Sequence, residues 1–246
     1  FNKCIRFNQD LNNWDTKRVD DMSYMFSYCS KFNGKLFKNV SNVYSMNSMF
    51  YNCKKFNQDL SDWDTRNVQD MSFMFCCSLN FNQDLNHWDV RKVKNMRYMF
   101  KDAIIFNGSL EDWNTKNVTN TEYMFCNAKN FNQVINNWNT KNVKNMRHMF
   151  CDAKKFNQVI CTCNTKNVED MSYMFRDTDF FDQYLNNWNI KNTKNMNGMF
   201  YNAINFNQKL DKWKLKDIQM NFMFYGTVKF NNKLKLKDNL NVLGIF

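Results

Sequence analysis

The 246-residue chain carries 34 basic and 23 acidic residues, a formal net charge of +11, and contains 25 Phe and 17 Met but only 5 Gly and no Pro. No run of 18 apolar residues occurs in it, which excludes a membrane-spanning helix of ordinary composition. Because glycine and proline are scarce, its turns must be built from Asn and Asp.

An internal repeat of 24 or 25 residues organises the chain. Counting from a recurring Phe at position 0, position 4 is Leu or Ile, position 7 is mostly Trp and position 12 is mostly Val. A Met-x-x-Met-Phe cluster follows at positions 15 to 19, and a small residue at position 22. The pattern predicts about ten turns, with an array over residues 1–229 and a degenerate repeat or cap over 230–246. The position 0 residues are Phe7, Phe32, Phe56, Phe81, Phe106, Phe131, Phe156, Phe181, Phe206 and Phe230.

Two short elements are predicted in each turn. The polar-Val-polar segment around position 12 predicts a minimal β-strand with the valine directed inward. Positions 15, 18, 19 and 22 are spaced i, i+3, i+4 and i+7, which predicts a helix of two to three turns. The residues just before this stripe are good helix N-caps: Asp21, Ser45, Asp70, Asn95, Asn120, Asn145, Asp170 and Asn195.

One strand and one helix per turn is an α/β repeat. The predicted fold is therefore a leucine-rich-repeat-like solenoid of about ten turns, each holding one short strand and one short helix. A flatter coil with irregular turns in place of the helices is the alternative.

The consensus Phe-Asn-Gln-x-Leu-x-x-Trp-x-Thr-x-x-Val-x-x-Met-x-x-Met-Phe resembles the BspA-like bacterial surface protein repeats. Such repeats also occur in mycoplasma lipoprotein-associated domains and in large DNA viruses, and the resemblance extends from Phe1 to about Lys229. It implies a leucine-rich-repeat-like solenoid displayed on a cell or virion surface and used in adhesion or protein binding. The nine cysteines depart from a typical secreted member and leave an intracellular reducing compartment open.

The cysteines do not predict a metal centre. An odd number argues against a fully paired disulfide framework. Cys126 and Cys151 stack in adjacent turns and could come within disulfide range, although reduced thiols are favoured. Cys161-x-Cys163, with Cys151 nearby, matches no standard zinc spacing, so repeat variation is the preferred interpretation.

No catalytic constellation is predicted. His87 and His148 occupy different repeat positions, and neither has a Cys or Ser in a recurring arrangement that would indicate a nucleophile. A glycine-rich phosphate loop is also absent from the sequence. We expect a protein that is not an enzyme and needs no cofactor.

A basic ridge is predicted at position 10. Residues 1–123 carry 16 basic and 14 acidic groups, a balance of +2, whereas residues 124–246 carry 18 and 9, a balance of +9. The ridge fits either a polyanion site or, preferably, a solvated edge that keeps the array soluble. It comprises Lys17, Arg66, Arg91, Lys116, Lys141, Lys166, Lys191 and Lys216.

A partner-binding surface is predicted at positions 11 and 13, beside the inward valine. Charge at these positions varies from turn to turn, as a recognition surface would, although unconstrained drift would look the same. Asn at position 1 is instead expected to hydrogen-bond from turn to turn inside the array. The candidate partner-binding residues are Lys92, Lys94, Asn117, Asn142, Lys144, Asn167 and Lys194.

The expected function is thus non-catalytic, surface-displayed binding of a protein or glycan, of the adhesion type. A structural component of a cell or virion surface, self-associating through the solenoid ends, is the alternative. Polyanion binding through the basic ridge is a weaker one.

Overall fold

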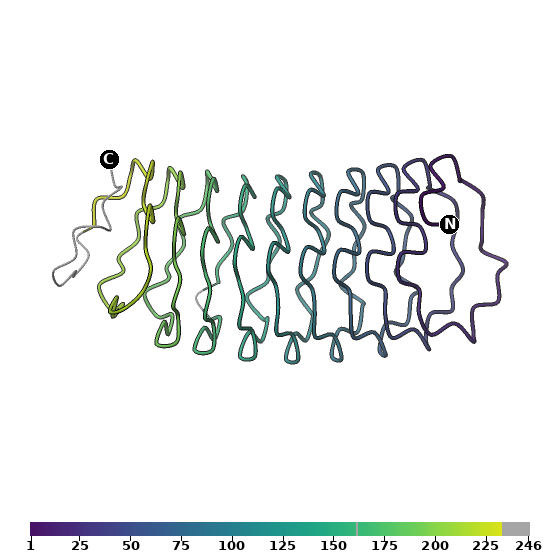
Figure 1. Cartoon of the computed structure of the whole chain (residues 1–246), viewed down its shortest axis with the longest axis horizontal. Coiled ribbons are helices and arrows are strands. Elements are labelled where there is room, and N and C mark those ends of the chain that lie inside the picture. The colour runs from purple at the N-terminus through teal and green to yellow at the C-terminus, as the bar shows by residue number, and fades with distance from the viewer. Residues whose placement is uncertain (161, 233–246) are drawn as a thin grey trace.

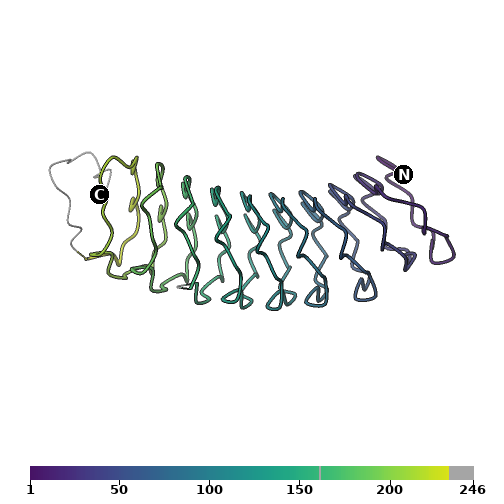
Figure 2. The ribbon, with the colours of Figure 1, turned by 90° about the horizontal axis from the view of Figure 1, so that it is seen from below.

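The chain winds into an elongated coil of stacked turns. A computed structural model describes residues 1–160 and 162–232, and its two ends lie at opposite ends of the stack (Figure 1). Seen from below, the stack is gently arched (Figure 2). The predicted cap at 230–246 lies outside the described residues, apart from 230–232.

The described residues form neither a helix nor a strand longer than one residue. Adjacent turns are joined instead by isolated parallel β-bridges. The predicted leucine-rich-repeat-like α/β fold is therefore wrong, and the coil of irregular turns describes the chain. Among these residues no helix has the length and apolarity that crossing a bilayer requires. The bridges run in one column through Asp21, Ser45, Asp70, Asn95, Asn120, Asn145, Asp170, Asn195 and Gln219.

Two left-handed residues per turn replace the predicted helix. Tyr98 has a φ of 60° and is the third residue of a four-residue turn closed by a 3.2 Å bond from the Met99 N–H to the Met96 carbonyl. Asp102, with a φ of 59°, holds the same place in the turn that ends at Ala103. A right-handed helix excludes positive φ, whereas a type II turn requires it at this third residue. Consecutive four-residue turns also bring residues i and i+3 to one side, so they share the apolar spacing of a helix.

The backbone donors of this segment point along the stack. The N–H groups of Met96, Tyr98 and Phe100 donate to carbonyls of the following turn at 3.0, 2.8 and 2.9 Å. In an α-helix each would bond four residues back within its own segment. No turn can therefore satisfy its own backbone, and each depends on its neighbours.

The predicted N-caps do accept the bonds expected of caps. The Ser72 N–H donates to Oδ1 of Asp70 at 2.8 Å, and the Arg147 N–H donates to Oδ1 of Asn145 at 2.9 Å. This two-residue reach is an Asx-turn, a local structure that Asp and Asn favour outside helices. The side chains that suggested a helix start thus shape the turn at each β-bridge.

The predicted strand is displaced as well. Val118 is buried as expected, but its N–H bonds to the Thr115 carbonyl at 2.9 Å and so closes another four-residue turn. Pairing between turns begins one residue later, where the Lys144 N–H donates to the Thr119 carbonyl at 3.0 Å. In place of the predicted strand, the structure has this single backbone hydrogen bond between turns, next to the column of β-bridges.

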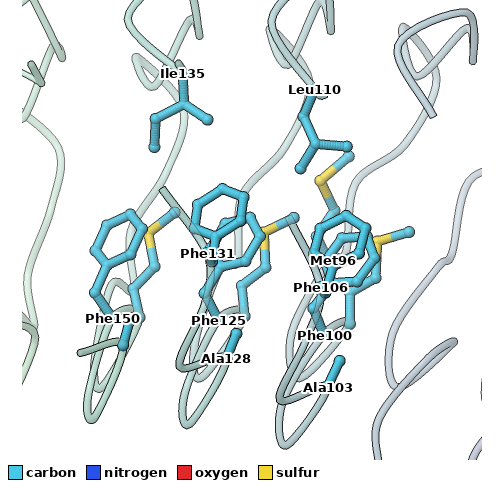
Figure 3. Packing of buried hydrophobic residues seen from close by; sticks show 14 of the residues in the cluster. Met96, Phe100, Ala103, Phe106, Leu110, Phe125, Ala128, Phe131, Ile135 and Phe150 are labelled. Atoms are coloured by element: carbon cyan, nitrogen blue, oxygen red, sulfur yellow. The ribbon is translucent and has the colours of Figure 1, made fainter. Parts of the chain in front are cut away.

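The predicted core columns are confirmed. Phe100, Phe125 and Phe150 stack along the axis with ring centroids 5.6 and 5.7 Å apart, and Phe131 lies 3.8 Å from Phe125 within its turn (Figure 3). These rings are fully buried, as are the small residues of position 22 such as Ala103. The core is therefore one continuous column of aromatic rings and methionines.

The position 1 asparagines form a ladder from turn to turn, as predicted. Oδ1 of Asn107 accepts the Asn132 N–H at 2.8 Å, and Oδ1 of Asn132 accepts the Asn157 N–H at 2.9 Å. Asp182 continues the ladder by accepting the Asn207 N–H at 2.8 Å. The bonds run from backbone to side chain, and the ladder lies at the edge of the array instead of inside it.

Candidate functional site

The residues predicted for partner binding lie on one side of the stack, beside the bridge column, together with the ridge. We call the side chains of positions 10, 11 and 13 the lysine face. Of the seven candidate partner-binding residues, six are exposed and Asn167 is half-buried, while all eight ridge residues are exposed.

The asparagines of this face hold the stack together. Each donates from Nδ2 to a position 10 carbonyl of the preceding turn: Asn117 to Arg91 at 2.6 Å, Asn142 to Lys116 at 2.7 Å and Asn167 to Lys141 at 2.8 Å. Their amide nitrogens are therefore engaged in the fold, and the cationic side chains remain the groups that could contact a partner.

Two lysines of this face also form polar contacts with the preceding turn, and these contacts are weak because they are exposed to water. Lys92 donates to Oδ1 of Asn67 at 2.7 Å. Lys194 pairs with Glu169 at 2.6 Å, and this hydrogen bond lowers the pKa of the Glu169 carboxyl. Because the two side chains are 76% and 46% exposed, water screens the pair, and an incoming carboxylate could replace Glu169.

A groove joins the two sets of candidates in the C-terminal turns. It has a volume of about 510 Å³ and brings four lysines together with two acidic side chains. Ridge residues and partner-binding residues contribute to the same hollow, so the sequence predicted two parts of one surface. Its lining comprises Lys144, Asn167, Glu169, Lys191, Asn192, Thr193, Lys194, Lys216 and Asp217.

The ridge is neutralised in the earlier turns. Arg66 pairs with Asp64 at 2.8 Å, and Arg91 pairs with Asp89 at 2.6 Å. The acidic position is then occupied by asparagine at Asn114, Asn139, Asn164 and Asn189, and by lysine at Lys214. Positive charge therefore accumulates toward the C-terminal turns, where the groove lies.

Sequence reasoning missed a second column of rings, at position 17. Phe73, Tyr98, Tyr123, His148 and Tyr173 stack with successive centroids 4.5, 4.7, 4.4 and 4.8 Å apart. The column ends at Gly198, where an added Cβ would lie 2.3 Å from Tyr173. These are left-handed residues, so the stacking stabilises a backbone that is unfavourable for non-glycine side chains.

The rings of this column are poorly placed to stack against a flat ligand. Each inner ring is covered on both faces by its neighbours, and guanidinium groups also lie over some of the rings: Arg97 is 5.2 Å from the Phe73 centroid and Arg176 is 5.9 Å from that of Tyr173. Bases and sugars bind to open ring faces. We therefore assign the column to stability.

Cys126 and Cys151 lie side by side in adjacent turns, as their repeat positions predicted. Both thiols are buried, and Cys151 belongs to the same four-residue turn as His148, with a 3.1 Å bond from its N–H to the His148 carbonyl. A hydrogen bond from Cys126, together with nearby His148 and Arg176, lowers the pKa of Cys151 below the ordinary value of a thiol. The sequence pattern predicted no nucleophile near either histidine, whereas the structure places the Cys151 thiol beside His148.

A family model described as "Mycoplasma protein of unknown function, DUF285" matches residues 1–39, 37–138 and 125–237. The chain belongs to this family. The match supports a repeat family of the mycoplasma type and does not extend to BspA-like repeats specifically. No curated protein matches the chain.

In this DUF285 protein the thiolate of Cys151 should be measurable. Alkylation by iodoacetamide needs the thiolate, so the rate at Cys151 should level off at a lower pH than the rate at an ordinary cysteine. Cys53, whose pKa is raised by burial, should react only in alkaline solution. Mass spectrometry of peptides labelled over a pH series would give both profiles.

Cys126→Ala is the matched variant for this titration. It removes the hydrogen bond to Cys151 and should move the midpoint of Cys151 alkylation to higher pH. A midpoint near the ordinary thiol value of about 8.5 in the unmodified protein would contradict the assignment.

Proposed function

We propose that this chain is a non-catalytic binding protein whose lysine face holds an acidic group of a protein or glycan partner. The observation that carries the proposal is the groove of Lys144, Lys191, Lys194 and Lys216, which is concave, exposed and more basic than acidic. Concave sites with convergent charged groups are where recognition concentrates on protein surfaces.

The repeat architecture supports this proposal. Because the turns stack with a fixed register, lysines from successive turns are held in rows on a rigid backbone. Such preorganisation reduces the ordering cost of binding. Display on a cell or virion surface, as the resemblance to BspA-like repeats implies, is part of the proposal and would place the lysine face where an external partner can reach it.

The test is binding to immobilised acidic and neutral glycans and to acidic and neutral peptides, with the unmodified chain and two variants. Lys144→Ala/Lys191→Ala/Lys194→Ala/Lys216→Ala should lose about 10-fold or more in affinity for the acidic member of one set, because rim charges each contribute modestly. The matched control removes four exposed lysines that lie outside the groove: Lys54→Ala, Lys55→Ala, Lys129→Ala and Lys155→Ala.

Equal losses in the two variants would show that only net charge matters and would contradict a site at the groove. A steep, uniform fall in affinity with salt for every polyanion tested would favour the polyanion alternative. Binding by the glycan set or by the peptide set alone would identify the class of partner.

A further inference from the structure

Two consecutive cysteines and an aspartate from the next turn converge on one point. Sγ of Cys76 lies 3.7 Å from Sγ of Cys77, and Sγ of Cys77 lies 3.6 Å from Oδ2 of Asp102. All three ligand-type atoms lie within 4.8 Å of one another. Cys76 is buried, and the other two residues are half-buried.

The coil itself produces this convergence. In an extended chain, consecutive side chains point to opposite faces. Cys77 instead has a φ of 60°, which brings its sulfur to the side of Cys76. Its N–H donates to the Lys101 carbonyl at 2.8 Å, and this bond fixes Cys77 against the turn that carries Asp102. Cys77 and Asp102 occupy the same repeat position one turn apart.

The distances match those of a tetrahedral zinc-type ion. Metal–sulfur bonds of about 2.3 Å and metal–oxygen bonds of about 2.0–2.2 Å place two sulfurs about 3.8 Å apart, and a sulfur and an oxygen about 3.5–3.7 Å apart. The observed separations of 3.7 and 3.6 Å fall at these values. Two of the three ligand separations thus match a tetrahedral ion, and the third, from Sγ of Cys76 to the Asp102 carboxylate, is within 4.8 Å.

The carboxylate is also oriented for this role. Nδ2 of Asn127, in the following turn, donates to Oδ1 of Asp102 at 2.7 Å, which leaves Oδ2 on the side of Cys77. Hydrogen bonding of a ligand's second atom is the usual way in which proteins fix metal ligands. Lys101 competes, because its ammonium pairs with Oδ2 of Asp102 and must turn away before a cation can bind.

We propose that Cys76, Cys77 and Asp102 bind a thiophilic divalent cation of the zinc type, with the fourth position left to water. Binding releases the thiol protons to solvent and joins two adjacent turns through the ion. The site is independent of the lysine face, so either assignment can fail without affecting the other.

The test is titration of the fully reduced chain with Co²⁺, followed by displacement with Zn²⁺. One equivalent of Co²⁺ should produce sulfur-to-cobalt charge-transfer absorption with tetrahedral visible bands, and Zn²⁺ should abolish them and raise the melting temperature. Cys76→Ser/Cys77→Ser should lose the absorption and the thermal shift, while Asp102→Asn should bind about 10–100-fold more weakly. Lys101→Ala should bind more tightly because the competing ammonium is gone.

The matched control is Cys126→Ser/Cys151→Ser, which removes a second pair of neighbouring thiols and should leave cobalt binding unchanged. Each variant should show the circular dichroism of the parent without metal, so that a loss of binding is not a loss of fold. Absorption that persists in Cys76→Ser/Cys77→Ser, or that disappears in the control, would overturn the proposal.

Discussion

Replacing Phe125 with alanine is expected to lower the free energy of unfolding by about 3–5 kcal/mol. The ring is fully buried and stacks against Phe131 at 3.8 Å and against Phe100 and Phe150 at 5.6 and 5.7 Å. Its removal leaves a cavity in the middle of a column that neighbouring turns cannot close without giving up their backbone bonds. Denaturant unfolding followed by circular dichroism would measure the loss.

Phe180→Ala is the control for this experiment. That ring is 58% exposed, so its truncation should change the free energy of unfolding by about 0.5 kcal/mol or less. Similar losses for the two variants would mean that the aromatic column is not the principal source of stability.

Replacing Asn132 with alanine should lower the free energy of unfolding by about 1–3 kcal/mol. The reason is that the Asn157 N–H loses its hydrogen-bond acceptor, Oδ1 of Asn132. Oδ1 of Asn132 also accepts from Nε2 of Gln158 at 3.2 Å. The loss should appear as a lower midpoint of denaturant unfolding with an unchanged slope.

Asn132→Asp tests whether the acceptor oxygen alone stabilises the ladder, because it keeps that oxygen and removes the amide nitrogen. Asp182 already fills the same ladder position and accepts the Asn207 N–H at 2.8 Å, so a carboxylate oxygen is compatible with this place. Asn132→Asp should therefore retain most of the stability that Asn132→Ala loses. If both variants lose the same amount, the acceptor is not what stabilises the ladder.

The sequence predicted the composition of the core but not the path of the backbone. Columns such as Phe100 and Ala103 are buried as expected, because burial depends on apolar side chains recurring once per turn. The helix failed because i, i+3 spacing is common to helices and to successive four-residue turns. Nothing in side-chain pattern alone signals that Tyr98 adopts a positive φ, since tyrosine ordinarily avoids it.

The candidate surface was predicted in part. Exposure of Lys144 and Lys194 followed from their place at position 13, next to the inward-directed position 12 that holds Val143 or Thr193, and the structure confirms that exposure. The engagement of Asn142 with the Lys116 carbonyl could not be foreseen, because it depends on the register between turns. The same register brings Asp102 to Cys77. Cys77 and Asp102 hold the same position in adjacent repeats, so their proximity is encoded in the repeat pattern of the sequence.

The bonding of each turn to its neighbours gives the array an unusual mechanical character. Since backbone donors such as that of Phe100 reach the following turn, pulling the chain ends apart should detach whole turns one at a time from an exposed end. Each detached turn of about 25 residues releases about 85 Å of extended chain. Under tension the molecule would lengthen in regular steps, each the length of one detached turn. It would shorten again by the same steps as the turns restack when the tension is released.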